Sequence, residues 1–163
     1  MSRGPRFKGI AVGGTFDPFH KGHRELLTNA FRAGEKVFVG VVSDKFSKRL
    51  GKTLEDNYEE RILRIRKFVD ENFPNSNFVI GKLEDYIGPV VVSDEVDAIV
   101  VTEETEVNVE RANRLRRGRR LKPLSVLRIP YVMAQDGQRI SSSRIRGNEI
   151  DSEGSVIRNR SRK

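Results

Sequence analysis

The sequence predicts one α/β domain, in which a parallel sheet of five strands has helices on both faces. Three observations support this fold class. Short apolar runs of strand length alternate with longer segments whose apolar residues recur at helical spacing. The first apolar run passes through a glycine-rich loop directly into a helix. A chain of 163 residues is long enough for one ordinary domain with its own core. We assign residues 1–147 to that domain and residues 148–163 to a basic, polar tail that we expect to fray.

The composition limits which groups are available for chemistry. Without cysteine the chain has no disulfide, no thiolate metal site and no cysteine nucleophile, so histidine, lysine, arginine, carboxylate and hydroxyl groups remain. The sequence has no apolar run that could span a bilayer, and residues 1–6 lack the apolar core of a signal peptide. We therefore expect a cytoplasmic protein without a membrane partner. The net charge of +8 suits a nucleic acid or a polyphosphate equally well.

The first strand is expected over residues 7–12 and the first helix over residues 22–33. Between them, Gly13 and Gly14 turn the backbone and let a phosphate approach it closely. The helix start adds unpaired N–H groups and a partial positive charge. This junction therefore predicts a site for nucleotide phosphates.

Two histidines, the only ones in the chain, bracket the start of this helix. His20 and His23 can face the same anion from the first helical turn, and Gly22 leaves room for that anion against the backbone. Two histidines can also fall near a helix start by coincidence. The strand and the glycine loop before them favour a functional pair.

A second buried strand is expected over residues 36–42, after Gly34 has capped the first helix. Two strands joined by a helix make a right-handed unit with parallel strands. Residues 43–52 begin at the end of this strand, so they lie at the same carboxyl edge as the histidine loop, where ligands bind in open α/β sheets. Lys45 comes first after the strand and is our preferred phosphate ligand. Lys48 and Lys52 stay open as alternatives.

The middle of the chain supplies one helix and two more strands. Asn57 is expected to cap a helix that ends at Phe73, with Glu60 completing a capping box. A short third strand follows at residues 78–80. The fourth strand, at residues 97–101, leads to polar residues at the same carboxyl edge.

The last third of the chain is rich in cations and hydroxyl groups. A helix is expected over residues 106–117, and seven basic residues with no acidic one lie between Arg111 and Lys122, which predicts a bound anion, either substrate phosphate or nucleic acid. A fifth strand at residues 125–129 precedes a run of three serines. One serine there is expected to cap a helix, and the three together, before Arg144, predict a nest for phosphate.

These motifs resemble a known superfamily. His-Lys-Gly-His at residues 20–23, after Gly-Thr-Phe-Asp-Pro at residues 14–18, resembles the HxGH signature of the nucleotidyltransferases. Residues 140–144 are similar to its ISSTxxR-type second motif, with Ser143 in place of the frequent threonine. The resemblance covers about residues 7–147 and implies a Rossmann-like nucleotidyltransferase fold.

Three further motifs resemble one branch, the archaeal phosphopantetheine adenylyltransferases and the matching domain of the eukaryotic bifunctional coenzyme A synthase. They are Ser-Asp-Lys at 43–45, Thr-Glu-Glu-Thr at 102–105 and Asn-Arg-Leu-Arg at 113–116. This resemblance implies adenylyl transfer from ATP to 4′-phosphopantetheine, giving dephospho-coenzyme A and pyrophosphate. Nicotinamide mononucleotide, flavin mononucleotide or a choline-type phosphate stays open as the acceptor.

The resemblance also implies roles for individual residues. His20 and His23 would hold the triphosphate and stabilise charge on the α-phosphate. Lys45 would bridge the two substrates, and Thr15 would position the nucleophilic phosphate. The other residues expected to bind nucleotide or phosphate are Gly13, Gly14, Phe16, Gly22, Glu103, Asn113, Arg114, Arg116, Ser141, Ser142, Ser143 and Arg144.

The expected cofactor is Mg²⁺, carried by the phosphates of ATP, and we assign it no protein ligand. A nucleic-acid-binding protein that used the basic patch would leave the paired histidines and the serine nest unexplained. No nucleic-acid partner is therefore expected. The oligomeric state stays open, with a monomer slightly favoured.

Overall fold

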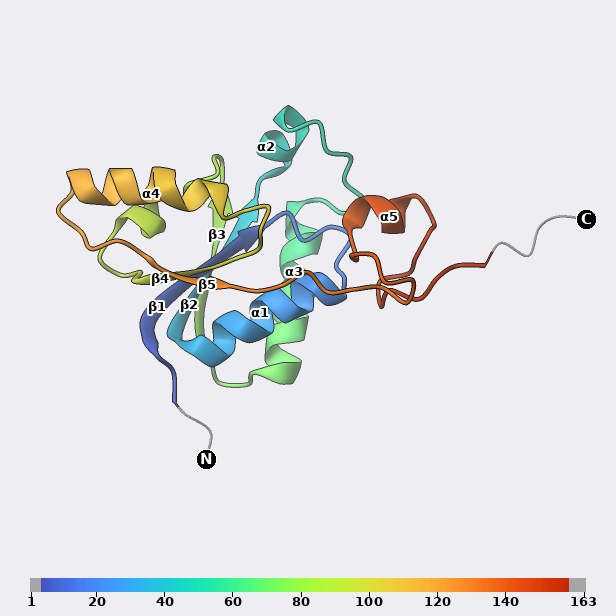
Figure 1. Ribbon diagram of the computed structural model, residues 1–163, viewed down its shortest axis with the longest axis horizontal. Helices are drawn as coiled ribbons and strands as arrows, with labels where there is room; N and C mark the ends of the chain where they lie inside the picture. The colour runs from blue at the N-terminus through green and yellow to red at the C-terminus, as the bar shows by residue number, and fades with distance from the viewer. Residues whose placement is uncertain (1–3, 159–163) are drawn as a thin grey trace, which may run out of the picture.

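The computed structural model describes residues 4–158 and contains one parallel sheet of five strands in the order β3-β2-β1-β4-β5 (Figure 1). The predicted fold class is therefore confirmed. The strands are β1 (Phe7–Gly14), β2 (Gly34–Val42), β3 (Asn77–Leu83), β4 (Ala98–Val101) and β5 (Ser125–Arg128). The helices are α1 (Lys21–Ala33), α2 (Asp44–Arg49), α3 (Tyr58–Asn72), the 3-10 helix η1 (Pro89–Val92), α4 (Val107–Gly118) and α5 (Ser142–Arg146).

Helices cover both faces of the sheet, as predicted. Alternating residues of β1 separate the two sides: Ile10 joins the core beneath α1 and α3, and Ala11 joins a second core beneath α4 and η1. Figure 1 shows α4 across the sheet from α1 and α3. Because both faces of the central strands are buried, their sequences are nearly continuous apolar runs.

The polar stretch after β2 holds a short helix that the sequence did not predict. Ser43 caps α2 by accepting a hydrogen bond on its Oγ from the amide of Phe46 at 2.9 Å. Phe46 and Ser47 are buried, while Lys45 faces outward. The next helix, α3, has the predicted capping box between Asn57 and Glu60.

The chain after α5 is folded where a frayed tail was expected. Ile150 is fully buried in a small cluster with Ala134 and Ile140, and it pairs in an isolated antiparallel bridge with Val156. The amide of Lys21, at the start of α1, donates to the carbonyl of Ser152 at 2.9 Å. The expectation is thus corrected for residues 148–158, while residues 159–163 lie outside the described part of the chain. None of the helices in residues 4–158 has the length and apolar character that crossing a membrane requires.

Candidate active site

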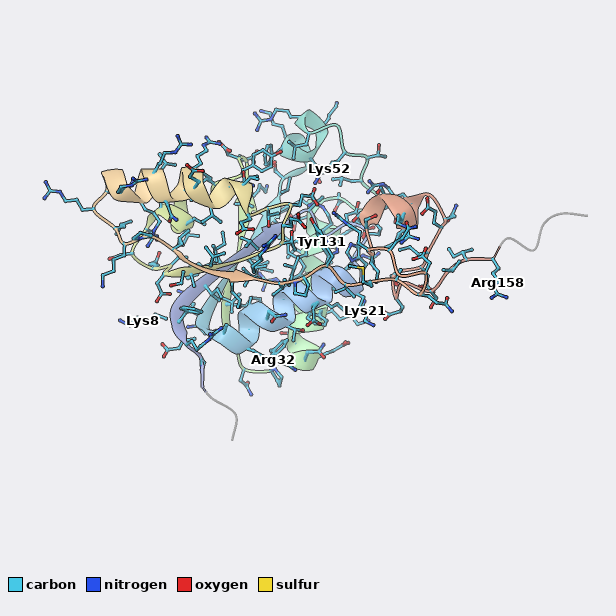
Figure 2. All side chains as sticks on the ribbon, viewed as in Figure 1. Lys8, Lys21, Arg32, Lys52, Tyr131 and Arg158 are labelled. Atoms are coloured by element: carbon cyan, nitrogen blue, oxygen red, sulfur yellow. The ribbon has the colours of Figure 1, made fainter. Side chains whose placement is uncertain are left out.

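A cavity of about 350 Å³ opens at the carboxyl ends of β1, β4 and β5. Its walls come from the β1–α1 loop, the chain after α2, the ends of β4 and β5, and the start of α5. Lys52 and Tyr131, both labelled in Figure 2, line it. Nine of the residues predicted from the sequence line this cavity: Gly13, Gly14, Thr15, His20, Gly22, His23, Ser141, Ser142 and Ser143.

The two histidines cap α1 reciprocally. The Nδ1 atom of His20 accepts hydrogen bonds from the amides of Gly22 (3.0 Å) and His23 (3.4 Å), and the Nδ1 atom of His23 accepts from the amide of His20 (3.3 Å). The two rings stack with their centroids 3.7 Å apart. Because each Nδ1 accepts from the backbone, a neutral ring carries its proton on Nε2. Each imidazole therefore keeps one N–H donor that the cap does not use.

Burial keeps both imidazoles uncharged near neutral pH. It lowers the pKa of His20 from 6.5 to about 4, with smaller contributions from the charges of Arg24 and Arg139. Burial, together with His20 and Lys52, also lowers the pKa of His23 well below its ordinary value. Without a ligand the pair offers neutral N–H donors to an anion.

Gly22 and Phe16 hold the histidines in place. A Cβ on Gly22 would lie 2.8 Å from Cε1 of His20, so only glycine lets that ring fold back over the helix start. Phe16, expected to bind the nucleotide, is instead buried in the core with its ring centroid 5.2 Å from that of His23. Phe16 therefore packs against the ring of His23 from the core side.

The lysine that lines the cavity is Lys52, whereas Lys45, the preferred phosphate ligand, does not line it. The Nζ of Lys52 donates to Oγ1 of Thr15 at 3.1 Å. Helix α2 leaves Lys45 exposed and outside the lining, and the chain then turns at Gly51, with φ +74°, to bring Lys52 inward. The sequence had left Lys52 among three alternatives because a six-residue helix leaves little periodic signal.

The serine run forms the start of α5, as predicted. The Oγ of Ser141 accepts from the amide of Arg144 at 3.3 Å and lies 3.2 Å from the Oγ of Ser143. The side chain of Arg144, however, is bound to Asp136 and Glu149 and does not line the cavity. Arg146, the second arginine that follows the serine run, lines the cavity in its place.

The residues expected from α4 and from the chain before it lie elsewhere. Arg116 is buried, and its guanidinium donates to the carbonyls of Val91, Ser93 and Lys122 at 2.8–2.9 Å. Asn113 accepts from the amide of Leu124 at 2.9 Å and lines a separate groove beside β5. Arg114 and Glu103 are exposed and outside the cavity. The physical reason is that α4 packs on the face of the sheet, where Arg116 ties it to η1.

Sequence reasoning missed a group on the β4–β5 side of the cavity. The guanidinium of Arg139 stacks 4.1 Å above the ring of Tyr131 and pairs with Glu104 at 3.0 Å. The amide of Glu104 donates to the hydroxyl of Tyr131 at 3.0 Å. Strand position had already placed Glu104 at the carboxyl edge, within the Thr-Glu-Glu-Thr motif. The same signal could have found Tyr131, which follows the end of β5.

The charges of the lining suit an anion. Lys52, Arg139 and Arg146 face two carboxylates, Asp17 and Glu104. Glu104 is paired with Arg139, and one oxygen of Asp17 accepts from the amide of Glu55 at 2.7 Å. Within residues 4–158, no three His, Asp or Glu side chains are grouped in a way that could hold a metal ion.

A second cavity, of about 450 Å³, lies over the face of β1, β2 and β3, and Gly13 lines both cavities. The lining of the second cavity is mainly apolar and includes Phe38, Leu83, Tyr86 and Val91.

Comparisons with known proteins agree with this geometry. The cytidylyltransferase-like family model matches residues 11–148. A phosphopantetheine adenylyltransferase of Methanopyrus kandleri is 45% identical, over 90% of this chain and 92% of that protein. One from Methanothermobacter thermautotrophicus is 41% identical, over 91% of this chain and 89% of that protein. A solved structure of a protein of unknown function from Archaeoglobus fulgidus superposes with a TM-score of 0.65 at 23% identity, covering 76% of this chain and 99% of its own, which supports the fold alone.

Proposed function

The chain belongs to the cytidylyltransferase-like family, and we propose that it transfers the adenylyl group of ATP to 4′-phosphopantetheine, giving dephospho-coenzyme A and pyrophosphate. The observation behind this proposal is that the paired histidines, the Lys52–Thr15 contact and the serine nest line one cavity. The names of the archaeal relatives support the choice of acceptor.

The reaction requires that the protein position the two substrates, and it needs no covalent intermediate with the protein. An oxygen of the ionised 4′-phosphate forms a bond to the α-phosphorus of ATP, and the bond from that phosphorus to the bridging oxygen of pyrophosphate breaks. Because the nucleophile is already an anion, no base has to remove a proton. The protein's task is to hold two anionic groups in line and to offset their charge.

The histidines are suited to the α-phosphate. Their Nε2–H groups are donors held at a helix N-terminus, where the helix dipole also favours negative charge. Donors fixed before the reaction stabilise developing charge without reorganising. An anion beside them also raises their pKa, which strengthens the hydrogen bonds in the bound state.

Lys52 is suited to bridge the two substrates. Its ammonium donates to Thr15, two residues after Gly13, and Gly13 lines both cavities. There the ammonium can offset the repulsion between the attacking phosphate and the triphosphate. Thr15 would orient that attacking phosphate.

The remaining walls fit the other parts of the substrates. The hydroxyls of Ser141, Ser142 and Ser143, with Arg146, would hold the β- and γ-phosphates. The stack of Tyr131 and Arg139 offers the adenine an aromatic and a guanidinium surface. The apolar second cavity suits the pantetheine arm, which is long, amide-bearing and uncharged.

Mg²⁺ would arrive with ATP and be held mainly by phosphate oxygens and water. When bound, it would offset part of the charge of the triphosphate. The cytoplasmic location and the oligomeric state stay predictions.

Pyrophosphate release from ATP tests the proposal directly. We expect rapid release with 4′-phosphopantetheine, and little with nicotinamide mononucleotide, flavin mononucleotide or choline phosphate, each offered alone. The control is ATP without any acceptor, which measures hydrolysis. Release that does not depend on 4′-phosphopantetheine would contradict the proposal.

A further inference from the structure

Helix α3 buries an arginine completely. The side chain of Arg61 is 0% exposed, although arginine is almost never fully buried unless its donors are paired. It directly follows Glu60, the last residue of the capping box of α3, and contacts the β1–α1 loop. Neither cavity includes it in its lining.

The guanidinium joins three segments of the chain. Its Nη1 donates to the carbonyl of Thr15 at 2.9 Å and to that of Val42, the last residue of β2, at 2.7 Å. Its Nη2 donates to Oδ1 of Asp44, in the first turn of α2, at 2.8 Å. One planar group thus fixes the loop after β1, the end of β2 and the start of α2 relative to one another.

The carboxylate of Asp44 also contacts the first residue of α3. Oδ2 of Asp44 accepts from the amide of Tyr58 at 3.2 Å, so Asp44 ties the start of α3 to α2. Partial burial opposes ionisation of Asp44, but the hydrogen bonds from Arg61 and Tyr58 outweigh it and hold its pKa below the ordinary value. The Asp44 carboxylate is therefore ionised at neutral pH, opposite the guanidinium of Arg61.

Stability alone does not account for this arrangement. Removing a guanidinium from water costs several kcal/mol, and well-packed apolar residues often serve a core equally well. What the arginine adds is geometry, because its donors have fixed directions. The geometry that it fixes includes the carbonyl of Thr15.

We propose that Arg61 is a positioning residue, which fixes Thr15 so that the Oγ1 of Thr15 receives Lys52 at the cavity. The inference rests on the proposed function, in which Lys52 bridges the two substrates. Lys52 itself lies on a segment that Asp17 anchors through the amide of Glu55. Arg61 fixes one side of the Lys52–Thr15 contact, and Asp17 fixes the other.

Arg61→Lys is the informative variant. A lysine keeps the positive charge, but its three donors sit on one rotating ammonium and cannot reproduce the planar arrangement of Nη1 and Nη2. A displacement of about 1 Å at a reacting group can cost roughly a hundredfold in rate. We therefore expect kcat to fall about 10- to 100-fold, with the KM values for ATP and 4′-phosphopantetheine changed much less.

Arg116→Lys is the matched control. Arg116 is also buried and also donates to backbone carbonyls, but it lies on α4, outside the cavity. Both variants are expected to lose stability, so kinetics are measured at a temperature where both remain folded. We expect kcat of Arg116→Lys to stay within about twofold of the wild type.

A ligand-free readout separates this inference from the proposed function. The chain has five threonines, so methyl-labelled threonine gives a sparse NMR spectrum in which Thr15 can be assigned. Arg61→Lys should shift the Thr15 methyl resonance, whereas Arg116→Lys should not. In Arg61→Ala, guanidinium chloride below denaturing concentrations should restore part of kcat and part of the wild-type shift.

Two results would overturn the inference: an unchanged Thr15 resonance in Arg61→Lys, or an equal loss of kcat in Arg61→Lys and Arg116→Lys. A wild-type protein that forms no dephospho-coenzyme A would instead overturn the proposed function. The Thr15 shift would then still decide whether Arg61 sets the position of Thr15.

Discussion

Each imidazole at the start of α1 uses one ring nitrogen for the backbone and keeps the other for the cavity. His20 and His23 accept amide hydrogen bonds through Nδ1, and Gly22 leaves the space that the first ring needs. The sequence predicted this pair because both histidines and the glycine are close in the chain. It did not predict Tyr131 or Arg139, whose contact depends on how the chain after β5 folds back.

His23→Asn should lower kcat about a hundredfold or more, because the donor proposed for the α-phosphate is lost. The asparagine oxygen can still accept from the amide of His20, so the helix start is expected to survive. Steady-state kinetics with a thermal unfolding curve check both statements. A folded variant with wild-type kcat would refute the role of His23.

Lys52→Met should lower kcat/KM about a hundredfold, whereas Lys45→Met should change it little, since only Lys52 lines the cavity. Both changes remove one positive charge and leave a side chain of similar length. The comparison therefore controls for the overall charge of the protein. A larger loss of kcat/KM in Lys45→Met than in Lys52→Met would assign the bridging role to Lys45.

At the level of elements, the strands were predictable and the connections were less so. Residues 36–42 form an apolar run that can only be buried, and the structure extends it by two residues to Gly34. Helix α2 escaped prediction because its six residues give no clear period. The lysine that lines the cavity, Lys52, follows this helix and its turn at Gly51, whereas the expected Lys45 lies in the first turn of the helix. The serine run was predictable at α5 because Ser141 caps it from within the motif itself.

The start of α1 should make the stability of the protein depend on pH. The pKa of His20 is about 4 in the fold against an ordinary 6.5, so the unfolded chain binds more protons between these values. This contribution is fully present above about pH 6.5 and is lost as the pH falls toward 4. His20→Asn keeps a capping oxygen but does not titrate.

The test compares the free energies of unfolding of the wild type and His20→Asn across that range. Relative to the variant, the wild type should lose up to about 2–3 kcal/mol between pH 7 and pH 4. Parallel pH profiles for the two proteins would contradict the lowered pKa.

The segment after α5 should contribute measurably to stability. Ile150 is fully buried, so Ile150→Ala should lower the free energy of unfolding by about 2–4 kcal/mol. Ile157 is 41% exposed and serves as the control, with a loss of less than about 1 kcal/mol expected for Ile157→Ala. Denaturant unfolding checks both, and equal losses would mean that the segment is not docked as described.

For the whole molecule, the sheet brings together groups that lie far apart in the chain. Thr15, Lys52 and the serines of α5 meet because parallel strands present their carboxyl ends at one edge. The basic stretch between Arg111 and Lys122 shows that a cluster of like charges in the sequence does not by itself locate an anion site. Its most buried member, Arg116, ties α4 to η1 and does not line the cavity.

The most direct test of this account is a competition for limiting ATP. Equimolar 4′-phosphopantetheine, nicotinamide mononucleotide and flavin mononucleotide are supplied together, and the adenylylated products are resolved by mass. Because a mainly apolar cavity shares Gly13 with the proposed phosphate site, we predict that dephospho-coenzyme A dominates. A mixture dominated by a dinucleotide would contradict the assigned acceptor, even if pyrophosphate release shows that the cavity transfers adenylyl groups.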